Sequence, residues 1–282
     1  MTQLTYDVHV CPGIPTSIDD LPPGIAQRMW SPIASTLIAG ERDAVLVDPP
    51  MTIAQSDALV AWLDRQGKNV TTIYITHGHG DHWFGISAVL RRFPAARAVA
   101  TAAVVAYMER NGSPQMVESF WAKRFPGQLP ERLIGADVLE GDHFELEGHE
   151  LAVIGLGHTD TDDTTCLHVP DLGLVVAGDA AYNDTHLYLA ESPPEGRTAW
   201  LAAIDTMEAL APRAVVAGHK RPQRADDPAI LAETREYILA FSEVAEKTST
   251  TLGLYEEMLT RYPDRVNPGA LWGSARATKG WD

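Results

Sequence analysis

The stretch that decides the fold is "YITHGHGDHWFG", residues 74–85, which places three histidines and one aspartate within six residues. It overlaps the end of the run "VTTIYIT" at 70–76, whose β-branched and apolar residues predict a buried strand. The segment "GISAVLRRFP" at 85–94 predicts a helix. The polar side chains therefore lie in a tight loop between strand and helix, where Gly78 and Gly80 allow the backbone to turn sharply.

The side chains in this loop are of the types that bind metals. The imidazoles of His77, His79 and His82 and the carboxylate of Asp81 are ligands that Zn²⁺ prefers. A catalytic zinc usually keeps three protein ligands and one open position. Four ligand groups in one loop therefore point to two metals, and a solvated polar loop is the alternative interpretation.

Three further residues stand in similar places later in the chain. His158 follows "LAVIGLG", Asp179 follows "LVVAG" and His219 follows "AVVAG". Each comes one residue after a glycine that ends an apolar run. A purely structural protein has no reason to repeat this placement, so we predict that all three side chains join the metal site.

The rest of the chain alternates predicted strands and helices. The segments 35–40 and 44–48 predict one hairpin, and 143–157 predicts another. A helix over 197–210 and a strand over 213–220 follow. This order predicts two sheets packed face to face with helices outside.

We predict one domain over residues 1–282, because no segment reads as a linker. Residues 101–130 contain two segments rich in bulky apolar side chains, which predict a helical, lid-like insertion. Residues 228–282 predict a helical C-terminal extension. Its last part, "LWGSARATKGW", could cap the body or pair two chains, which leaves a homodimer open.

The order of the ligand-type residues resembles that of the metallo-β-lactamase superfamily over roughly residues 30–220. The resemblance implies an α/β fold, a four-layer αββα sandwich with metals at the edge where both sheets end. It implies two zinc ions per chain, with iron or manganese as other candidate metals. The implied ligands are His77, His79 and His158 for one metal, Asp81, His82 and His219 for the other, and Asp179 between them.

The resemblance also implies a metal-dependent hydrolase. Two cations acidify a water and supply hydroxide at neutral pH. Asp81 is the candidate acid–base group beside its metal. Tyr182, three residues after Asp179, resembles the tyrosine that positions the carbonyl in acyl-homoserine lactonases. A small, largely apolar lactone is therefore the leading substrate, and a tyrosine packed below the site is the alternative.

Other members of the same fold provide rival functions. A glyoxalase-II-like thioesterase is the alternative hydrolase. The segment "GHTDTDDTT" at 157–165 departs from the "GHTPGH" common to lactonases and these thioesterases, so the substrate stays open between the two classes. Asp160, Asp162 and Asp163 in it are either turn residues or partners that orient ligand histidines. An iron-dependent oxygenase and a metal-stabilised binding protein are rivals from other classes. A dedicated β-lactamase is disfavoured, because the best-known subclasses lack an aspartate at the place of Asp179.

Several aromatic residues are candidates for contact with the substrate. Trp83 follows the metal loop directly, and Phe120 and Trp121 lie in the predicted lid. Such side chains would form an apolar wall suited to an acyl chain or a ring. His186 is a further candidate. Ordinary packing in the core is the alternative for each of them.

Bulk composition limits the partners and the compartment. The formal net charge is −16, which argues against nucleic acid and anionic membranes and leaves a small-molecule substrate. The two cysteines, Cys11 and Cys166, form no disulfide framework. The N-terminus shows no signal-peptide pattern. These features together predict a cytoplasmic protein.

Overall fold

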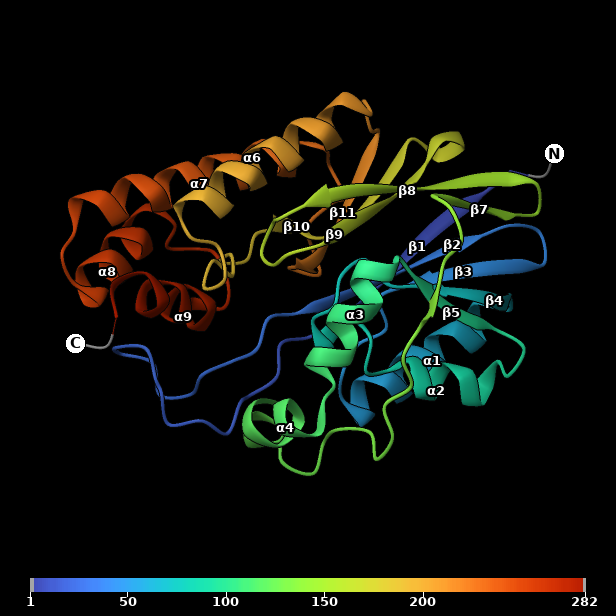
Figure 1. Cartoon of the computed structure of the whole chain (residues 1–282), viewed down its shortest axis with the longest axis horizontal. Helices are drawn as coiled ribbons and strands as arrows, with labels where there is room; N and C mark the ends of the chain where they lie inside the picture. The colour runs from blue at the N-terminus through green and yellow to red at the C-terminus, as the bar shows by residue number, and fades with distance from the viewer. Residues whose placement is uncertain (1–2, 281–282) are drawn as a thin grey trace.

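The strands of the protein form two sheets, seen in a computed structural model that describes residues 3–280 (Figure 1). The first sheet has the order β1-β2-β3-β4-β5-β6 and the second has the order β11-β10-β9-β8-β7. The first sheet consists of β1 (Thr5–Cys11), β2 (Ile33–Ala39), β3 (Asp43–Val47), β4 (Asn69–Tyr74), β5 (Arg97–Ala100) and β6 (Asp137–Val138). The second consists of β7 (His143–Leu146), β8 (His149–Gly157), β9 (Thr164–Val169), β10 (Leu174–Asn183) and β11 (Ala214–Lys220).

Helices cover the outer face of each sheet, and an apolar layer lies between the sheets (Figure 1). The first sheet carries α1 (Ile53–Gln66), α2 (Ile86–Arg92) and α3 (Ala102–Asn111). The second sheet carries α6 (Pro194–Ala209) and α7 (Ala229–Lys247). Side chains from both sheets, such as Ile38 and Val176, fill the layer between them. The predicted αββα sandwich is therefore confirmed.

The pairing of the strands brings several strand ends to one edge. β2 and β3 pair antiparallel, as do β7 and β8, so both predicted hairpins are confirmed. β3, β4 and β5 run parallel, and β10 and β11 also run parallel. Every residue of β10 is buried, which suits a near-continuous apolar run in the middle of a covered sheet. The carboxyl ends of parallel strands meet at the same edge, and this is where the polar residues follow.

The predicted lid is helical but broken into short pieces. After α3 come α4 (Pro114–Met116), a π-helical turn η2 (Val117–Trp121) and α5 (Ala122–Arg124). The segment between β1 and β2 lies beside these pieces, since the Ser17 amide donates a hydrogen bond to the Arg124 carbonyl. Strand β1, which was not predicted from the sequence, lies at the edge of the first sheet.

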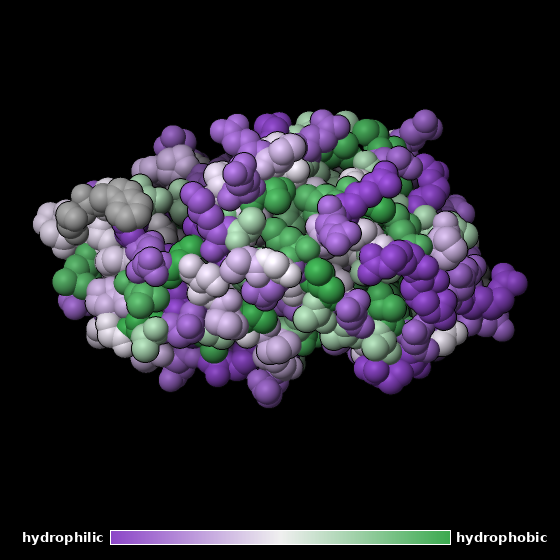
Figure 2. All heavy atoms as spheres, turned by 90° about the horizontal axis from the view of Figure 1, so that it is seen from below, coloured by the Kyte–Doolittle hydropathy of each residue, from purple (hydrophilic) through white to green (hydrophobic). Residues whose placement is uncertain are grey.

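The C-terminal region is helical. α8 (Thr251–Arg261) and α9 (Pro268–Lys279) follow α7 and lie next to one another (Figure 1). Within residues 3–280, no helix has both the length and the apolar composition that crossing a membrane requires. Figure 2 shows hydrophilic side chains around much of one face, with apolar side chains scattered between them.

Candidate metal centre

Ligand-type side chains from both sheets meet at one edge of the sandwich. His77 and His79 follow the end of β4, and Asp81 and His82 lie on the 3-10 turn η1 (Gly80–His82). From the second sheet, β10 and β11 contribute the remaining predicted carboxylate and histidine. All these side chains are buried.

Two glycines permit this close approach of the sheets and the ligands. Gly178 adopts a φ of +53°, and a Cβ there would lie 2.3 Å from the hydroxyl oxygen of Thr76. A Cβ at Gly218 would lie 2.3 Å from Oδ1 of Asp179. At Gly178 and Gly218, which precede Asp179 and His219, a larger residue would therefore clash with its neighbours.

The first ligand group contains His77, His79, Asp160 and Asp179, whose candidate ligand atoms all lie within 4.8 Å of one another. Oδ2 of Asp160 lies 2.9 Å from Nδ1 of His79 and 3.8 Å from Nε2 of His77. The carboxylate of Asp160 is fully buried. It faces the nitrogen atoms that a shared cation would bind.

The second ligand group contains Asp81, His82 and His219. Asp179 lies against this group as well, because its Oδ1 is 3.2 Å from Nε2 of His82 and its Oδ2 is 3.2 Å from Nε2 of His219. Oδ2 of Asp81 lies 3.5 Å from the same nitrogen of His219. Asp179 is therefore shared between the two groups.

The outer nitrogens of the histidines have partners that fix their orientation. Nδ1 of His219 lies 2.9 Å from the carbonyl oxygen of Pro32, so it donates a proton there and leaves Nε2 as the free ligand atom. Nδ1 of His77 lies 3.0 Å from the hydroxyl of Thr76. Such contacts are typical of metal-binding histidines.

Asp48 contacts both ends of the loop that contains His77 and His82. Its carboxylate accepts hydrogen bonds from the amide of Thr76 at 2.9 Å and from its hydroxyl at 2.7 Å, and its Oδ2 lies 3.5 Å from Nδ1 of His82. Asp48 has a φ of +54° and is buried. This role of Asp48 was not predicted from the sequence, although an aspartate at the end of "AVLVD" is a visible signal.

Glu191 supports His79 from the other side. One carboxylate oxygen lies 3.3 Å from Nε2 of His79, and the other accepts hydrogen bonds from Tyr107 at 2.8 Å and Thr161 at 2.7 Å. These hydrogen bonds, with His79 foremost, outweigh burial and lower the pKa of Glu191 to about 2. Sequence offered no signal for this contact between distant segments.

The buried polar atoms fit a pair of cations. Within residues 3–280, Nε2 of His77, Nε2 of His82, Oδ2 of Asp160 and Oδ1 of Asp179 make no hydrogen bond. Burial opposes the charge on Asp179, but His219 and His82 outweigh it and hold its pKa well below the usual range. A buried carboxylate oxygen that makes no hydrogen bond is costly unless a cation compensates it. The nitrogen and oxygen donors suit zinc, iron and manganese.

The family model of the metallo-beta-lactamase superfamily matches residues 28–219, which include all of these side chains. The chain belongs to the metallo-beta-lactamase superfamily. Its members are generally metal-dependent hydrolases, and the cluster of histidines and aspartates is of a kind that can bind metal.

Two curated relatives of the chain are hydroxyacylglutathione hydrolases. The one from Vibrio cholerae serotype O1 is 27% identical over 120 residues, which is 42% of this chain and 36% of the relative. The one from a Synechococcus strain is 40% identical over 62 residues, which is 22% of each chain. The matches thus span from about a fifth to about a third of these relatives.

Solved structures with the superfamily fold resemble the whole chain. A metallo-beta-lactamase from Pontibacter korlensis has a TM-score of 0.62 and 16% identity, over 85% of this chain and 99% of that one. A metallo-beta-lactamase family protein from Thermus thermophilus has a TM-score of 0.64 and 20% identity, over 96% of this chain and 91% of that one. At these identities the likeness shows the fold alone.

The superfamily motif and the structure differ at His158. Among residues 3–280, none of the groups of ligand type includes it. Its Nδ1 lies 2.6 Å from Oδ1 of Asp162, and its Nε2 lies 3.3 Å from the hydroxyl of Ser192. The physical reason is local: β8 has a bulge before Gly157, and Gly157 adopts a φ of +72°. The turn then directs Asp160, and not the residue directly after the glycine, into the site.

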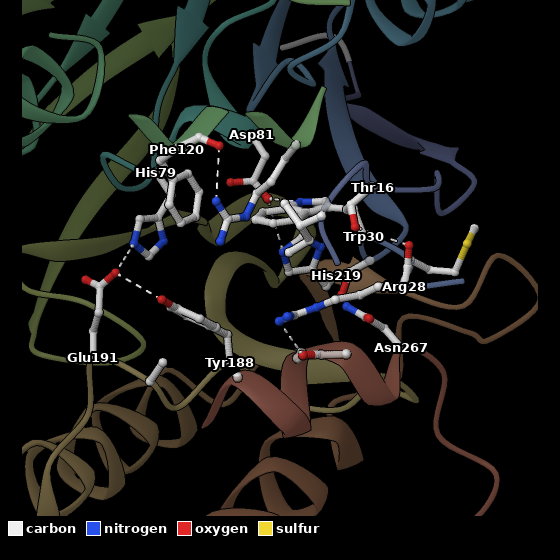
Figure 3. A pocket seen from close by; sticks show the side chains of 18 of the residues that line it. Thr16, Arg28, Trp30, His79, Asp81, Phe120, Tyr188, Glu191, His219 and Asn267 are labelled. Carbon is white, nitrogen blue, oxygen red and sulfur yellow. Dashed lines mark hydrogen bonds and ion pairs between the residues drawn. The ribbon is translucent and has the colours of Figure 1, made fainter. Parts of the chain in front are cut away.

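A cavity of about 320 Å³ opens over the metal centre (Figure 3). Phe120 and Trp121 line it, and so do Asp81, Tyr182 and His219; contact of Phe120 and Trp121 with a substrate stays a prediction. The far wall of the cavity was not predicted from the sequence, and it comes from the segment between β1 and β2 and from α9 with the residue before it. The residues of that wall include Thr16, Arg28, Trp30, Asn267, Gly273 and Arg276.

Trp30 connects this wall to the metal centre. Its Nε1 donates a hydrogen bond of 2.8 Å to Oδ2 of Asp81, and its ring packs against Phe120, Trp121 and Phe125 at centroid distances of 5.5–6.4 Å. Nothing in the local sequence signals this contact.

Two predicted substrate contacts lie elsewhere. Trp83 donates a hydrogen bond to the carbonyl of Gly78 at 3.0 Å and lines a separate cavity beside α3. His186 is fully buried, and its Nδ1 lies 2.8 Å from the hydroxyl of Tyr237 on α7. Neither side chain lines the cavity at the metal centre. Proximity to the motif in sequence placed Trp83 wrongly, because its indole turns back under the loop.

Tyr182 lies at the candidate metal centre, but its hydroxyl faces Asp179, one of the candidate metal ligands. Its hydroxyl donates a hydrogen bond of 3.0 Å to Oδ2 of Asp179. Burial and then the charge of Asp179 raise the pKa of this phenol well above its ordinary value, so it stays protonated as a donor. Its role toward a substrate carbonyl stays a prediction.

Proposed function

We propose that this protein is a dinuclear zinc hydrolase that cleaves the acyl bond of a small, largely apolar carbonyl substrate. The observation that carries the proposal is Asp179, which lies between two groups of metal ligands beneath a cavity. A metal that only stabilises a fold is usually closed off by four protein ligands. Here seven side chains, with Asp179 shared, would serve two metals, which is fewer than four separate side chains for each, and Asp81 and His219 line the cavity.

The side chains of the protein would position the reacting groups and transfer a proton. Metals bound in the two groups would polarise the carbonyl and acidify the attacking water. Trp30 holds Oδ2 of Asp81 at the cavity floor, where this carboxylate can accept a proton and return it to the leaving oxygen or sulfur. Burial opposes the charge on Asp81, but His82 and His219 outweigh it and lower its pKa, so it is ready to accept.

The walls of the cavity favour an apolar acyl group. Trp30, Phe120 and Trp121 present aromatic faces around the space above Asp81. Their rings would exclude water from the acyl group and strengthen electrostatic interactions at the centre.

Two substrate classes satisfy this site. A lactone is the leading candidate, supported by Tyr182 at its offset from Asp179 and by the apolar walls. A thioester is the second candidate, supported by the partial similarity to hydroxyacylglutathione hydrolases. Both reactions use the same attack and the same proton transfer, so the leaving group alone separates them.

The test is proton release from a substrate panel by the protein loaded with zinc, and separately with manganese or iron(II). The panel contains acyl-homoserine lactones, aromatic lactones, a glutathione thioester and a cephalosporin. We expect acid release from a lactone or thioester that is lost in His79→Ala and retained in Arg97→Gln, a change at a side chain that is 70% exposed. Silence of every metal form on every substrate would contradict the proposal.

A further inference from the structure

The outer wall of the cavity carries a concentration of positive charge. Arg28, Arg124 and Arg276 all line the cavity, although the whole chain has a net charge of −16. Arg28 extends toward the middle of the cavity from the side opposite Glu191 (Figure 3). Since three guanidinium groups line one cavity of an acidic protein, the question is which carboxylates neutralise them.

Asp20 is the carboxylate that serves two of these arginines. Its Oδ2 lies 2.9 Å from Nη1 of Arg28, and its Oδ1 pairs with Nη1 of Arg276. Both arginine side chains are mostly buried, with 14% and 11% of their surface exposed. The carboxylate of Asp20 is therefore shared between the two guanidinium groups.

Arg124 has no carboxylate partner within ion-pair distance among residues 3–280. Its Nη1 donates a hydrogen bond of 3.1 Å to the carbonyl of Phe120, and its guanidinium lies over the Phe120 ring at 3.5 Å from the centroid. Stacking on an aromatic ring explains its orientation. It does not explain why an acidic chain leaves this cation without a carboxylate.

The other acidic groups of the cavity are occupied. Glu191 accepts hydrogen bonds from Tyr107 and Thr161 and contacts His79. Asp81 and Asp179 face the ligand histidines, where metals would neutralise them. The cavity therefore has negative charge at its floor, which metals would match. At its outer wall, the guanidinium of Arg124 has no carboxylate partner among residues 3–280.

Burial and the nearby Arg28 lower the pKa of Arg124 to about 10, and the side chain still carries its charge at neutral pH. A partly buried cation without a counter-charge is costly, and an anionic ligand would remove that cost. A guanidinium offers parallel donors that match the two oxygens of a carboxylate.

We propose that Arg124, with Arg28 beside it, forms a subsite for a carboxylate at the end of the substrate remote from the scissile carbonyl. The inference rests on the proposed function, because it takes the metal centre as the place of the carbonyl. The substrate is then an acyl ester, lactone or thioester with an apolar middle, held by Trp30 and Phe120, and a terminal carboxylate.

The kinetic test uses a matched pair of substrates, the 4-nitrophenyl monoester of adipic acid and the same compound with its free carboxylate methylated. We expect the metal-loaded wild type to prefer the carboxylate form by about tenfold or more in kcat/KM, as one charge-assisted pair would give. Arg124→Gln should reduce this ratio to near one, and Arg124→Lys should retain part of it. Arg97→Gln, outside the cavity, should keep the wild-type ratio.

A binding measurement separates this inference from the proposed hydrolase. The quenching of tryptophan fluorescence reports binding, since Trp30 and Trp121 line the cavity. The probes are the monoamide of adipic acid and its neutral diamide, which offer no ester bond. Tighter binding of the monoamide, lost in Arg124→Gln, with no turnover of either ester would overturn the hydrolase and leave the subsite standing. Equal binding of both probes by the wild type would overturn the subsite, whatever the turnover.

Discussion

The loop that contains His77 and His82 and the turn at 158–163 reach the same edge of the sandwich from different sheets. Each follows a strand and is rich in side chains that bind metals. In the loop, every predicted ligand lies in one of the groups of side chains that could hold a metal. In the turn, Asp160 lies in such a group, and His158 faces Asp162 and Ser192 instead.

The difference between the two segments shows when a sequence pattern can predict the direction of a ligand side chain. In the loop, alternating glycines and ligands leave little freedom in the direction of each side chain. The turn begins at a bulge and a left-handed glycine, Gly157, so counting residues from the end of β8 does not tell which side chain points inward. Both segments could be assigned to the metal edge, but only the loop could be assigned residue by residue.

The difference also has a chemical consequence. With Asp160, the first group combines two histidines with two carboxylates, where the superfamily motif implied three histidines and one carboxylate. Two histidines and a carboxylate also form the facial set of non-haem iron(II) sites. Iron and manganese therefore belong beside zinc in every reconstitution.

The largest effect is expected from Asp179, which joins the two regions. Asp179→Ala removes oxygens that lie 3.2 Å from both His82 and His219. Turnover should fall by more than about 100-fold, beyond the usual effect of a residue that only supports ligands. Steady-state kinetics on the best substrate measures this. Asp163→Asn, at an exposed position of the turn, is the matched control and should stay near wild type; equal activity of both variants would contradict a shared ligand.

The next effect concerns Glu191, whose carboxylate contacts His79 in the loop and Thr161 in the turn. Glu191→Gln keeps the shape of the side chain but removes the charge beside Nε2 of His79. We expect metal affinity to weaken by about 10- to 100-fold, as for other partners of ligand histidines. Competition with a chelating dye measures the affinity. An unchanged affinity would mean that His79 is oriented by the backbone of the loop alone.

An effect of similar size, on kcat and not on metal affinity, is expected where the far wall meets the loop. Trp30→Phe retains an aromatic ring but removes the hydrogen bond to Oδ2 of Asp81. The loss of one hydrogen bond to a charged group costs about 1.5–3 kcal/mol, so kcat should fall by roughly 10- to 150-fold. A fall in kcat/KM caused by KM alone would assign Trp30 to substrate binding and not to the positioning of Asp81.

The smallest effect on activity is expected at His186, which lies outside both regions. Burial and then the charge of Arg265 lower its pKa from 6.5 to about 3, so it is neutral when folded. Unfolding lets it take up a proton, so its contribution to stability is complete above about pH 6.5 and is lost as pH falls below that value. Between pH 6.5 and 5 the wild type should lose about 2 kcal/mol more than His186→Gln.

The measurement is denaturant unfolding of both proteins at the two pH values, with chelator present throughout so that metal release does not contribute. Parallel loss of stability in the two proteins would contradict a buried neutral histidine. Kinetics at neutral pH should remain close to wild type in the variant, because His186 does not line the cavity.

Much of the fold could be predicted from the sequence, because it depends on local patterns. The apolar runs of β4, β10 and β11 and the helical periodicity of α1 determine their own structure. The residues that were missed depend on contacts between distant segments. Trp30 meets Asp81 across 51 positions, and Glu191 meets His79 across 112. No local pattern records such contacts, and the arginine wall was missed for the same reason.

The central claim is that Asp160, and not His158, completes the first ligand group. Elemental analysis of the wild type, Asp160→Ala and His158→Ala, each dialysed against the same limiting metal, tests it most directly. Circular dichroism establishes that all three proteins are folded. We predict one metal for each ligand group in the wild type and in His158→Ala, and loss of one of them in Asp160→Ala. Full metal content in Asp160→Ala together with loss in His158→Ala would contradict the account.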